Sequence, residues 1–325
     1  MKVYDFINRD SIQEVSPPGY YSILPDNSII LQNFSFSSLN NLDSISKTGV
    51  QIVFVDWSYD PIRQINYNSI PILTQVIEKK FKQARCIILS SKCSDYYTNQ
   101  NNILWYPSIL LNKYDDNPVR PRQKRIGCLN RRNAPHRIWL MHNLLSQGLV
   151  DHDRDIFSVL FNNAFSNGPA GVSNWISITK EDKEALNHYP DEISTVPDGF
   201  PMDYSVSHPA WNTAITVITE TEVGDNTLIT EKTVKGLVGR CCWMLYAGND
   251  QFTVLTSLGF EIGLFDQHPT KYNIDPVLKM CATLDNESTA MDYYHSKIDK
   301  INHNYNWYRN GWLTVYLKKL NAFLT

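Results

Sequence analysis

Short β-rich runs alternate with helical patterns along this chain, and that alternation limits the folds open to it. Residues 51–56 and 86–91 are apolar enough to be buried strands, and residues 70–83 between them have a helical period. Residues 103–108 are one more candidate strand. This order is typical of parallel α/β units, so we expect an α/β fold and neither a sandwich nor a helical bundle.

A second α/β series follows a polar stretch, residues 111–125, which contains two prolines and no apolar period. Beyond it the patterns predict strands at 125–129, 156–161, 214–219 and 241–248 and helices at 134–147, 230–239 and 250–258. The chain has 325 residues, which is more than one average domain needs. We therefore expect two Rossmann-like domains, residues 1–120 and 121–285, and a C-terminal helical segment, 286–325, that packs back across them.

Composition excludes several classes of protein. The formal net charge is -3, so any anion site must come from local clustering. No apolar run is long enough to span a membrane, and we expect a cytoplasmic protein without a membrane partner. The 6 cysteines include no C-x-x-C pair, which predicts reduced core thiols and no metal site.

Two predicted helix starts carry cations where the helix dipole disfavours them. Thr230 is the expected cap of one helix, and Lys232 and Lys235 lie in its first turns. The other start, residues 130–137, is crowded with basic side chains: Arg131, Arg132, His136 and Arg137. A cation at this end of a helix costs about 0.3–1 kcal/mol.

A bound anion would account for both starts, because phosphate at a helix N-terminus accepts the free N–H groups and neutralises neighbouring Arg and Lys. Each start also follows a predicted strand, and open α/β sheets bind ligands at such turns. The alternative is that these are long side chains in solvent, since Lys232 and Lys235 fall opposite Val234 and Leu237 on a helical wheel.

Carboxylates at strand ends are candidates for hydroxyl binding and for catalysis. Glu220 and Glu231 would suit a sugar or ribose hydroxyl beside the phosphates. Asp56 ends a predicted strand, and we take it as the first candidate general base, with Asp60 as the second. The alternatives are a dipole-favoured first-turn residue for Glu231, an exposed loop acid for Glu220, and a capped turn before Pro61.

A basic stretch, residues 119–132, is concentrated in an otherwise acidic chain. Its first part is the candidate surface for a nucleic-acid backbone and comprises Arg120, Arg122, Lys124 and Arg125. A solvated linker is the alternative. Neither G-x-G-x-x-G nor G-x-x-x-x-G-K-[ST] is present, which argues against a dinucleotide enzyme and a P-loop ATPase.

Three segments follow one another along the chain: "CLNRRNAPHRIWLMHNLLSQGLVD", "VITETE" and "LITEKTVKGLVGRCCWMLYAGNDQFTVLTSLGFEIGLFD". In their order and in the T-E-K-T-x-K element of the third, they resemble a glycosyltransferase family common in tailed phages and large viruses. The similarity covers about residues 125–266 and extends more distantly to the donor half of fucosyltransferases and exostosin-like enzymes.

The resemblance implies two Rossmann-like domains facing a cleft, the GT-B-like arrangement, with a nucleotide-sugar in the C-terminal one. Carried over by position, the donor-binding residues are Arg131, Arg132, His136, Arg137, Glu220, Thr230, Glu231, Lys232 and Lys235. The co-substrate would be a UDP- or GDP-sugar with no further cofactor. The implied acceptor is a hydroxymethylated pyrimidine in phage DNA, within the host cytoplasm. A glycan or protein acceptor and a non-catalytic nucleic-acid-binding protein remain alternatives.

Overall fold

The computed structural model divides into two compact units, residues 1–113 with 316–325 and residues 114–315. The predicted boundary lay at residues 120 and 121, and the predicted helical segment 286–325 is shared between the units. The structure describes residues 2–8, 11–15, 27–32, 42–45, 50, 52–56, 75–77, 79–81, 85–89, 92–93, 103–106, 110, 121–130, 134–160, 192–194, 208–220, 223, 227–270 and 273–324.

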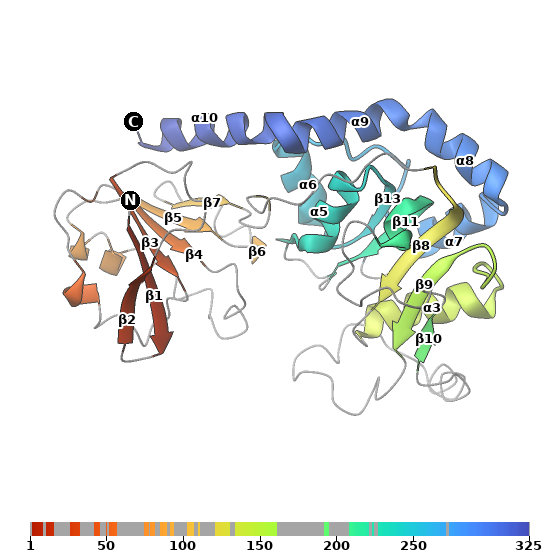
Figure 1. Cartoon of the computed structure of the whole chain (residues 1–325), viewed down its shortest axis with the longest axis horizontal. Coiled ribbons are helices and arrows are strands. Elements are labelled where there is room, and N and C mark those ends of the chain that lie inside the picture. The colour runs from red at the N-terminus through yellow and green to blue at the C-terminus, as the bar shows by residue number, and fades with distance from the viewer. Residues whose placement is uncertain are drawn as a thin grey trace. The chain divides into compact units, whose positions relative to one another are not determined.

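The first unit contains a sheet that is parallel except for one edge strand. Its strands are β1 (Lys2–Asn8), β2 (Ser11–Val15), β3 (Ser28–Gln32), β4 (Ile52–Asp56), β5 (Arg85–Leu89) and β7 (Ile103–Tyr106), with β6 (Lys92–Cys93) outside it. The order is β2-β1-β3-β4-β5-β7, and only β2 runs antiparallel (Figure 1). The strands predicted at 51–56, 86–91 and 103–108 are confirmed. Residues 75–77 and 79–80 of the predicted helix 70–83 are helical.

Consecutive apolar residues explain why this sheet is parallel. Side chains alternate between the faces of a strand, and Ile52, Val53, Phe54 and Val55 are all at most 2% exposed, so both faces of β4 are covered. The described parallel strands follow one another across the sheet in chain order without a reversal. Asp56 ends β4, among described parallel strands whose order shows no reversal of the kind that creates a crevice.

The second unit contains a sheet whose strand order does reverse. Its strands are β8 (Lys124–Asn130), β9 (Ile156–Leu160), β10 (Glu192–Ser194), β11 (Thr213–Thr219) and β13 (Cys242–Tyr246), in the order β10-β9-β8-β11-β13. β10 is antiparallel to its neighbour and the other strands are parallel. From β8 the chain moves outward to β9 and then returns to add β11 on the other side of β8. The strands predicted from apolar runs in this part of the chain are confirmed.

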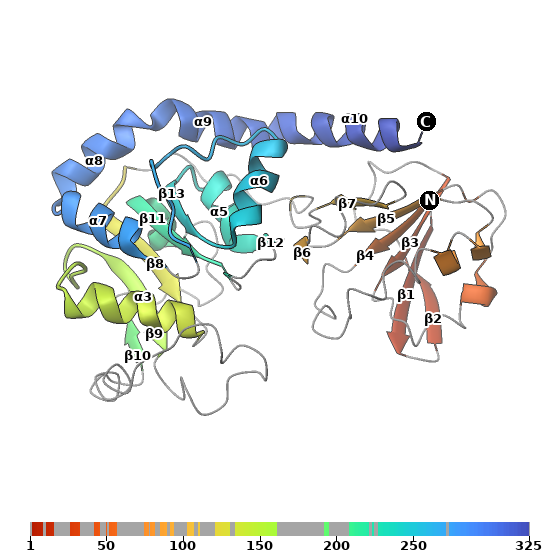
Figure 2. The same ribbon diagram turned by 180° about the vertical axis from the view of Figure 1, so that it is seen from behind.

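Helices connect and cover these strands, and Figures 1 and 2 show α3 beside β9 and α5 beside β11 and β13. The connecting elements are α3 (Pro135–Ser146), the 3-10 helix η6 (Pro209–Asn212), β12 (Thr227–Leu228), α5 (Glu231–Val238) and α6 (Asn249–Ser257). α5 packs closely because Gly236 has no side chain: a Cβ there would lie 2.5 Å from Cδ1 of Ile218. The three helices confirm the predictions at 134–147, 230–239 and 250–258.

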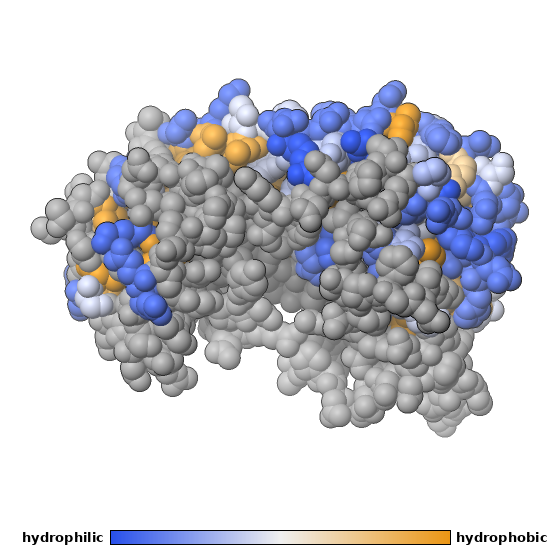
Figure 3. Space-filling view, viewed as in Figure 1, coloured by the Kyte–Doolittle hydropathy of each residue, from blue (hydrophilic) through white to orange (hydrophobic). Residues whose placement is uncertain are grey.

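A run of helices ends the chain. It comprises α7 (Asp275–Thr283), α8 (Glu287–Ser296), α9 (Ile298–Asn306), the π-helix η7 (Trp307–Gly311) and α10 (Trp312–Leu324). Figure 3 shows mainly hydrophilic surface with some hydrophobic patches along this run; in α9, Asp299 and Lys300 are exposed while Ile301 is buried. In the first unit, the guanidinium of Arg85 lies 5.4 Å from the centre of the Phe323 ring. None of the described helices combines the length and apolarity needed to cross a membrane.

A buried ion pair joins the amino end of the second sheet to its helices. Nε and Nη2 of Arg125 lie 2.9 and 2.6 Å from the carboxylate oxygens of Asp155. The same guanidinium donates to the carbonyls of Leu149, Cys281 and Leu284, so it ties the loop before β9 and the end of α7 to β8. Desolvation works against the charge, yet the pKa of Arg125 is raised because Asp155 more than offsets it.

These contacts correct the prediction for Arg122 and Arg125, which were expected to form part of a nucleic-acid-binding surface. Arg125 is 1% exposed and cannot reach a phosphate backbone. Arg122 donates to the carbonyls of Trp211, Gly239 and Arg240 and lies over the Tyr294 ring. Lys124 donates to the carbonyl of Asp153. All three side chains thus donate hydrogen bonds to main-chain carbonyls. Arg120, the fourth residue of the predicted surface, lies outside the described residues.

Removing one partner of the buried pair should destabilise the second unit strongly. Asp155→Ala leaves the Arg125 charge buried and the N–H groups of Ile126 and Asp151 unpaired, so we expect a loss of about 3–5 kcal/mol in the free energy of unfolding. Arg154→Ala is the control, because the Arg154–Asp151 pair is 40% exposed on both sides and should contribute about 0–1 kcal/mol. Urea unfolding measures both variants, and equal losses would contradict this account.

Candidate functional site

The reversal of strand order in the second sheet brings two strand ends and two helix starts together. β8 leads into α3 and β11 leads towards α5, in opposite directions across the sheet. Their last residues are adjacent: Oγ1 of Thr219 donates to Oδ1 of Asn130 at 2.5 Å. Such a switch point at the carboxyl edge of parallel strands is where open α/β sheets bind ligands.

The start of α3 supplies two of the predicted site residues, His136 and Arg137. Both are buried, and both meet the end of β11: Nε2 of His136 lies 2.9 Å from the carbonyl oxygen of Glu220, and Nη2 of Arg137 donates to the same oxygen at 3.0 Å. Arg137 also donates to the carbonyl of Thr219 at 3.3 Å. The structure thus brings together residues that are more than 80 positions apart in sequence.

His136 is uncharged, which corrects the expectation that it adds positive charge. Burial and, to a smaller extent, the charges of Arg137 and Lys232 lower the pKa of His136 to about 3, although the hydrogen bond with the Glu220 carbonyl opposes this shift. Because Nε2 faces a carbonyl oxygen, it is the nitrogen that carries the proton. The ring edge packs against Tyr246, with 5.6 Å between ring centres. His136 therefore orders the site without contributing charge.

The carboxylate of Glu220 binds the start of α5 and is 0% exposed. Oε1 accepts from the N–H of Thr230 at 3.2 Å and from the hydroxyl of Thr233 at 2.5 Å, and Oε2 accepts from the hydroxyl of Thr230 at 2.5 Å. Nε2 of Gln251, in α6, lies 3.4 Å from Oε1. Glu220 was predicted to hold a donor hydroxyl; instead an internal carboxylate occupies the positive end of α5.

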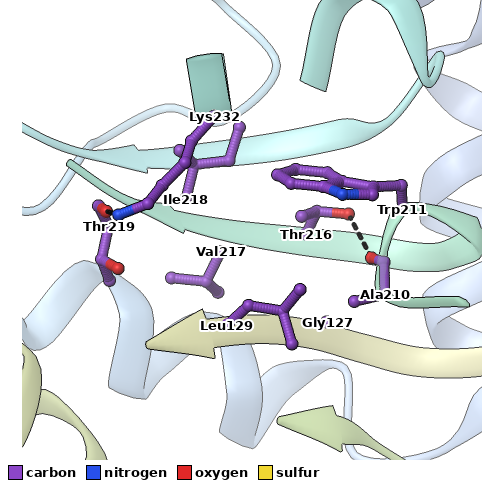
Figure 4. A pocket seen from close by; sticks show the side chains of 9 residues that line it. All are labelled: Gly127, Leu129, Ala210, Trp211, Thr216, Val217, Ile218, Thr219 and Lys232. Carbon is purple, nitrogen blue, oxygen red and sulfur yellow. Dashed lines mark hydrogen bonds between the residues drawn. The ribbon is translucent and has the colours of Figure 1, made fainter. Parts of the chain in front are cut away.

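Lys232 lies at the edge of this cluster and is only partly buried. Its ammonium donates to the carbonyl of Thr219 at 2.7 Å (Figure 4). Burial and Arg137 lower the pKa of Lys232 to about 7, and the carboxylates of Glu220 and Glu231 oppose this shift. Glu231 is exposed beside it, whereas Lys235 is buried.

A small pocket opens next to Lys232, as Figure 4 shows, with the Trp211 ring towards its other end. Its lining comprises Gly127, Leu129, Ala210, Trp211, Thr216, Val217, Ile218, Thr219 and Lys232. Gly127 is required here because a Cβ would lie 2.4 Å from the carbonyl oxygen of Ala210. Among the described residues the lining is mostly apolar, and the ammonium of Lys232 is the one charged group that it contains.

Several predicted residues are not part of this described cluster. The main chain of Asp56 ends β4, and its side chain lies outside what the structure describes. Asp60, Arg131 and Arg132 also lie outside the described residues. Within the described ranges, no group of three or more His, Cys, Asp or Glu side chains is arranged to hold a metal ion.

Sequence reasoning missed the neutral members of the cluster, which are Asn130, Thr219, Thr233 and Gln251. Each of these four residues is at most 1% exposed and forms hydrogen bonds within the cluster. The available signal was a polar residue ending each of two otherwise apolar strands, "GCLN" and "VIT". Such residues are expensive to bury without partners, so their positions indicate an internal polar network.

No family model and no curated protein sequence matches the chain. Similar solved structures include the DNA-modifying enzyme β-glucosyltransferase with and without uridine diphosphoglucose, at a TM-score of 0.42 and 10% identity, covering 90% of this chain and 81% of that chain. T4 phage BGT in complex with its UDP-glucose substrate has a TM-score of 0.40, 10% identity and the same coverages, 90% and 81%. An α1,3-fucosyltransferase has a TM-score of 0.35 and 9% identity, covering 86% and 89%. These TM-scores are too low to carry an argument about fold or function.

Acid should destabilise the second unit through His136. The folded-state pKa of about 3 is below the unfolded value of 6.5, so between these values only the unfolded chain binds the proton, and stability falls as pH falls. The slope should approach roughly 1.4 kcal/mol per pH unit. His136→Gln keeps a donor for the Glu220 carbonyl and should flatten this slope in urea unfolding between pH 6 and pH 4, about the range in which the protonation difference is largest.

His295→Gln is the matched control, because His295 is exposed on α8. It should leave the acid dependence of the unfolding free energy unchanged. If His136→Gln and the wild type had the same acid slope, His136 would not be the group that titrates.

Proposed function

We propose that this protein is a glycosyltransferase whose second unit binds a nucleoside-diphosphate sugar at the switch point between β8 and β11. The setting of Lys232 carries the proposal. Its ammonium lies at the carboxyl edge of the parallel sheet, bonds a single carbonyl, and has no carboxylate within ion-pair distance among the described residues. A phosphate group supplies the negative charge that such an ammonium lacks.

The contacts that we propose with the nucleotide-sugar differ from those that the sequence alone predicts. Lys232 binds a phosphate oxygen, and exposed Glu231 accepts from a ribose or sugar hydroxyl. Arg137 adds positive electrostatic potential to the site, while its guanidinium donates hydrogen bonds to the carbonyls at the end of β11. Lys235 is buried, so we propose no phosphate contact for it. Thr230 caps α5 and acts through the main chain.

The chemistry of such a transfer needs negative charge to be stabilised as the nucleoside diphosphate leaves. A protonated Lys232 does this by direct interaction, in a setting of low polarity that strengthens it. The acceptor hydroxyl needs a base, and Asp56 remains the first candidate and Asp60 the second. Arg131 and Arg132 remain proposed diphosphate ligands from their position before α3.

For the acceptor we propose a hydroxymethylated pyrimidine in DNA, on the resemblance to phage glycosyltransferases. A base within a duplex must be flipped out before its hydroxyl can react. The buried Arg125 and the hydrogen-bonded Arg122 take no part in this proposal, which leaves Arg120 and Lys124 as candidate backbone contacts. A glycan or protein acceptor is the alternative.

Binding of UDP or GDP should be accompanied by proton uptake at Lys232. At pH 8 most Lys232 side chains of the free protein are neutral, and a bound diphosphate raises their pKa. The protons come from the buffer, and Hepes and Tris have different ionisation enthalpies. The binding enthalpies measured by calorimetry at pH 8 in the two buffers should therefore differ in proportion to the number of protons taken up. Lys232→Met should abolish this difference and weaken binding about 10- to 100-fold.

Lys279→Met is the control, because Lys279 is exposed on α7 and distant in sequence from the site. It should bind nucleotide with wild-type affinity and proton uptake. Binding to DNA alone, with no response to either nucleoside diphosphate, would instead support a non-catalytic nucleic-acid-binding protein.

The acceptor is tested by incubating duplex DNA that contains hydroxymethylated pyrimidines with UDP- and GDP-sugars and measuring the intact mass of the DNA. We expect the mass to rise by one sugar residue per modified base, and unmodified DNA to stay unchanged. Glu231→Gln should reduce the rate about 10-fold or more, because it loses a charge-assisted hydrogen bond. Transfer to a glycan or protein but not to DNA would overturn the acceptor assignment alone.

A further inference from the structure

The dipeptide Thr219-Glu220 ties together the starts of three helices. Its carbonyl oxygens accept from His136 and Arg137 of α3 and from the ammonium of Lys232 of α5. The Glu220 carboxylate accepts from the start of α5 and from Gln251 in the first turn of α6. Gln251 also donates to the hydroxyl of Thr233 at 3.0 Å. α3, α5 and α6 all begin at the carboxyl edge of this sheet, and the dipeptide contacts each of them. We call the Glu220 carboxylate and its hydrogen bonds to α5 and α6 the brace.

The brace reaches Lys232 through a short chain of hydrogen bonds. The hydroxyl of Thr230 donates to Oε2 of Glu220 at 2.5 Å and accepts from the main-chain N–H of Lys232 at 3.3 Å. The Lys232 side chain then returns to the carbonyl of Thr219, the residue next to Glu220. Hydrogen bonds therefore connect both the main chain and the side chain of Lys232 to the same dipeptide, Thr219-Glu220.

We infer that Glu220 is a positioning residue: it holds Glu231 and Lys232 at the switch point, it places a negative charge at the start of α5, and it does not contact a ligand itself. This inference rests on the proposed function for its consequence in binding. Glu220 is 0% exposed, and residues of α5 and α6 donate hydrogen bonds to its carboxylate oxygens. A ligand could reach this carboxylate only if the hydrogen bonds at the start of α5 were broken.

The charge effect separates this role from a merely structural one. Among the described residues, the groups whose charges act on the pKa of Lys232 are Arg137 from α3, Glu220 from the end of β11, Glu231 from its own helix and Cys128 from β8. His136 is neutral, and burial keeps the thiol of Cys128 protonated by raising its pKa to about 11. Removing the Glu220 charge takes away a negative charge that favours the protonated amine, so Lys232 should lose its proton at a lower pH than in the wild type.

Competitive acetylation with trace acetic anhydride tests this without any nucleotide. Only the neutral amine reacts, so the acetylation of Lys232, measured by peptide mass spectrometry from pH 5 to pH 10, reports its titration. We expect the wild-type midpoint near pH 7 and a lower midpoint in Glu220→Gln. Exposed Lys279 is the internal reference in the same samples. An unchanged midpoint in a folded Glu220→Gln protein would overturn the inference.

Thr233→Val separates position from charge, since it removes one hydrogen bond to the carboxylate and keeps the negative charge. It should leave the Lys232 midpoint in place and loosen the helix start. Thr233→Val also keeps the inference testable if Glu220→Gln does not fold. An acetylation midpoint of Lys232 shifted down to pH 6 in Thr233→Val, where the Glu220 charge is still present, would show that this charge does not determine the pKa of Lys232.

Nucleotide binding tests the positioning role. We expect Glu220→Gln and Thr233→Val each to weaken binding of UDP or GDP about 10-fold or more, although neither side chain is exposed to a ligand. Met280→Ala is the matched control, because it opens a cavity in α7, destabilises the same unit by about 2–5 kcal/mol and leaves the switch point intact. Affinity lost equally in Met280→Ala would mean that the brace is only structural.

The two proposals fail in different ways. If wild-type protein bound neither nucleotide and Lys232 were not protected from acetylation by them, the proposed function would fail while the acetylation midpoints still decided the role of Glu220. If nucleotide protected Lys232 in the wild type and in Glu220→Gln with equal affinity, the proposed function would stand and the positioning role would fail.

Discussion

The candidate site depends on one buried carboxylate, Glu220, at the end of a central parallel strand. A parallel sheet gathers the starts of several helices at its carboxyl edge, and each start carries unpaired N–H groups and a positive dipole end. A carboxylate inside that edge meets both needs at once: it accepts from the main chain and hydroxyls of α5, and its negative charge lies beside the dipole. Without it, that edge would hold Arg137 and Lys232 with no internal carboxylate.

The lysine at the start of α5 is explained by this internal charge. On the sequence alone, Lys232 in the first turn of a helix breaks the dipole rule and calls for an external anion. In the folded protein, Glu220 occupies the dipole end, and the side chain of Lys232 reaches back to a strand carbonyl, where a cation is favoured. An anion is therefore not needed to explain the fold. The case for a ligand rests on Lys232 being partly exposed and lacking an ion pair among the described residues.

Basic residues with similar sequence settings have different roles in this protein. Arg122 and Arg125 lie two and five residues after Arg120 in one basic run, yet their guanidinium groups bind carbonyls and a carboxylate inside the second unit. A guanidinium has donors in a fixed fork, which suits it to join a helix end to a strand. A basic run in a sequence is thus no measure of a basic surface, because burial removes its members one by one.

The sequence by itself determined the local structure, since strands and helices follow from apolar periodicity and capping within a few residues. The strands β8, β9, β11 and β13 and the helices α3, α5 and α6 lie where the patterns put them, whereas β10, η6 and β12 were not predicted. The strand-to-helix turns were identified as the candidate site. What only the tertiary structure decided is which polar groups are satisfied internally. Glu220 meets Gln251 from 31 positions away, and Arg125 meets the carbonyl of Cys281 from 156 positions away. Such pairings depend on strand order and helix packing, which bring distant segments together, so no local pattern specifies them.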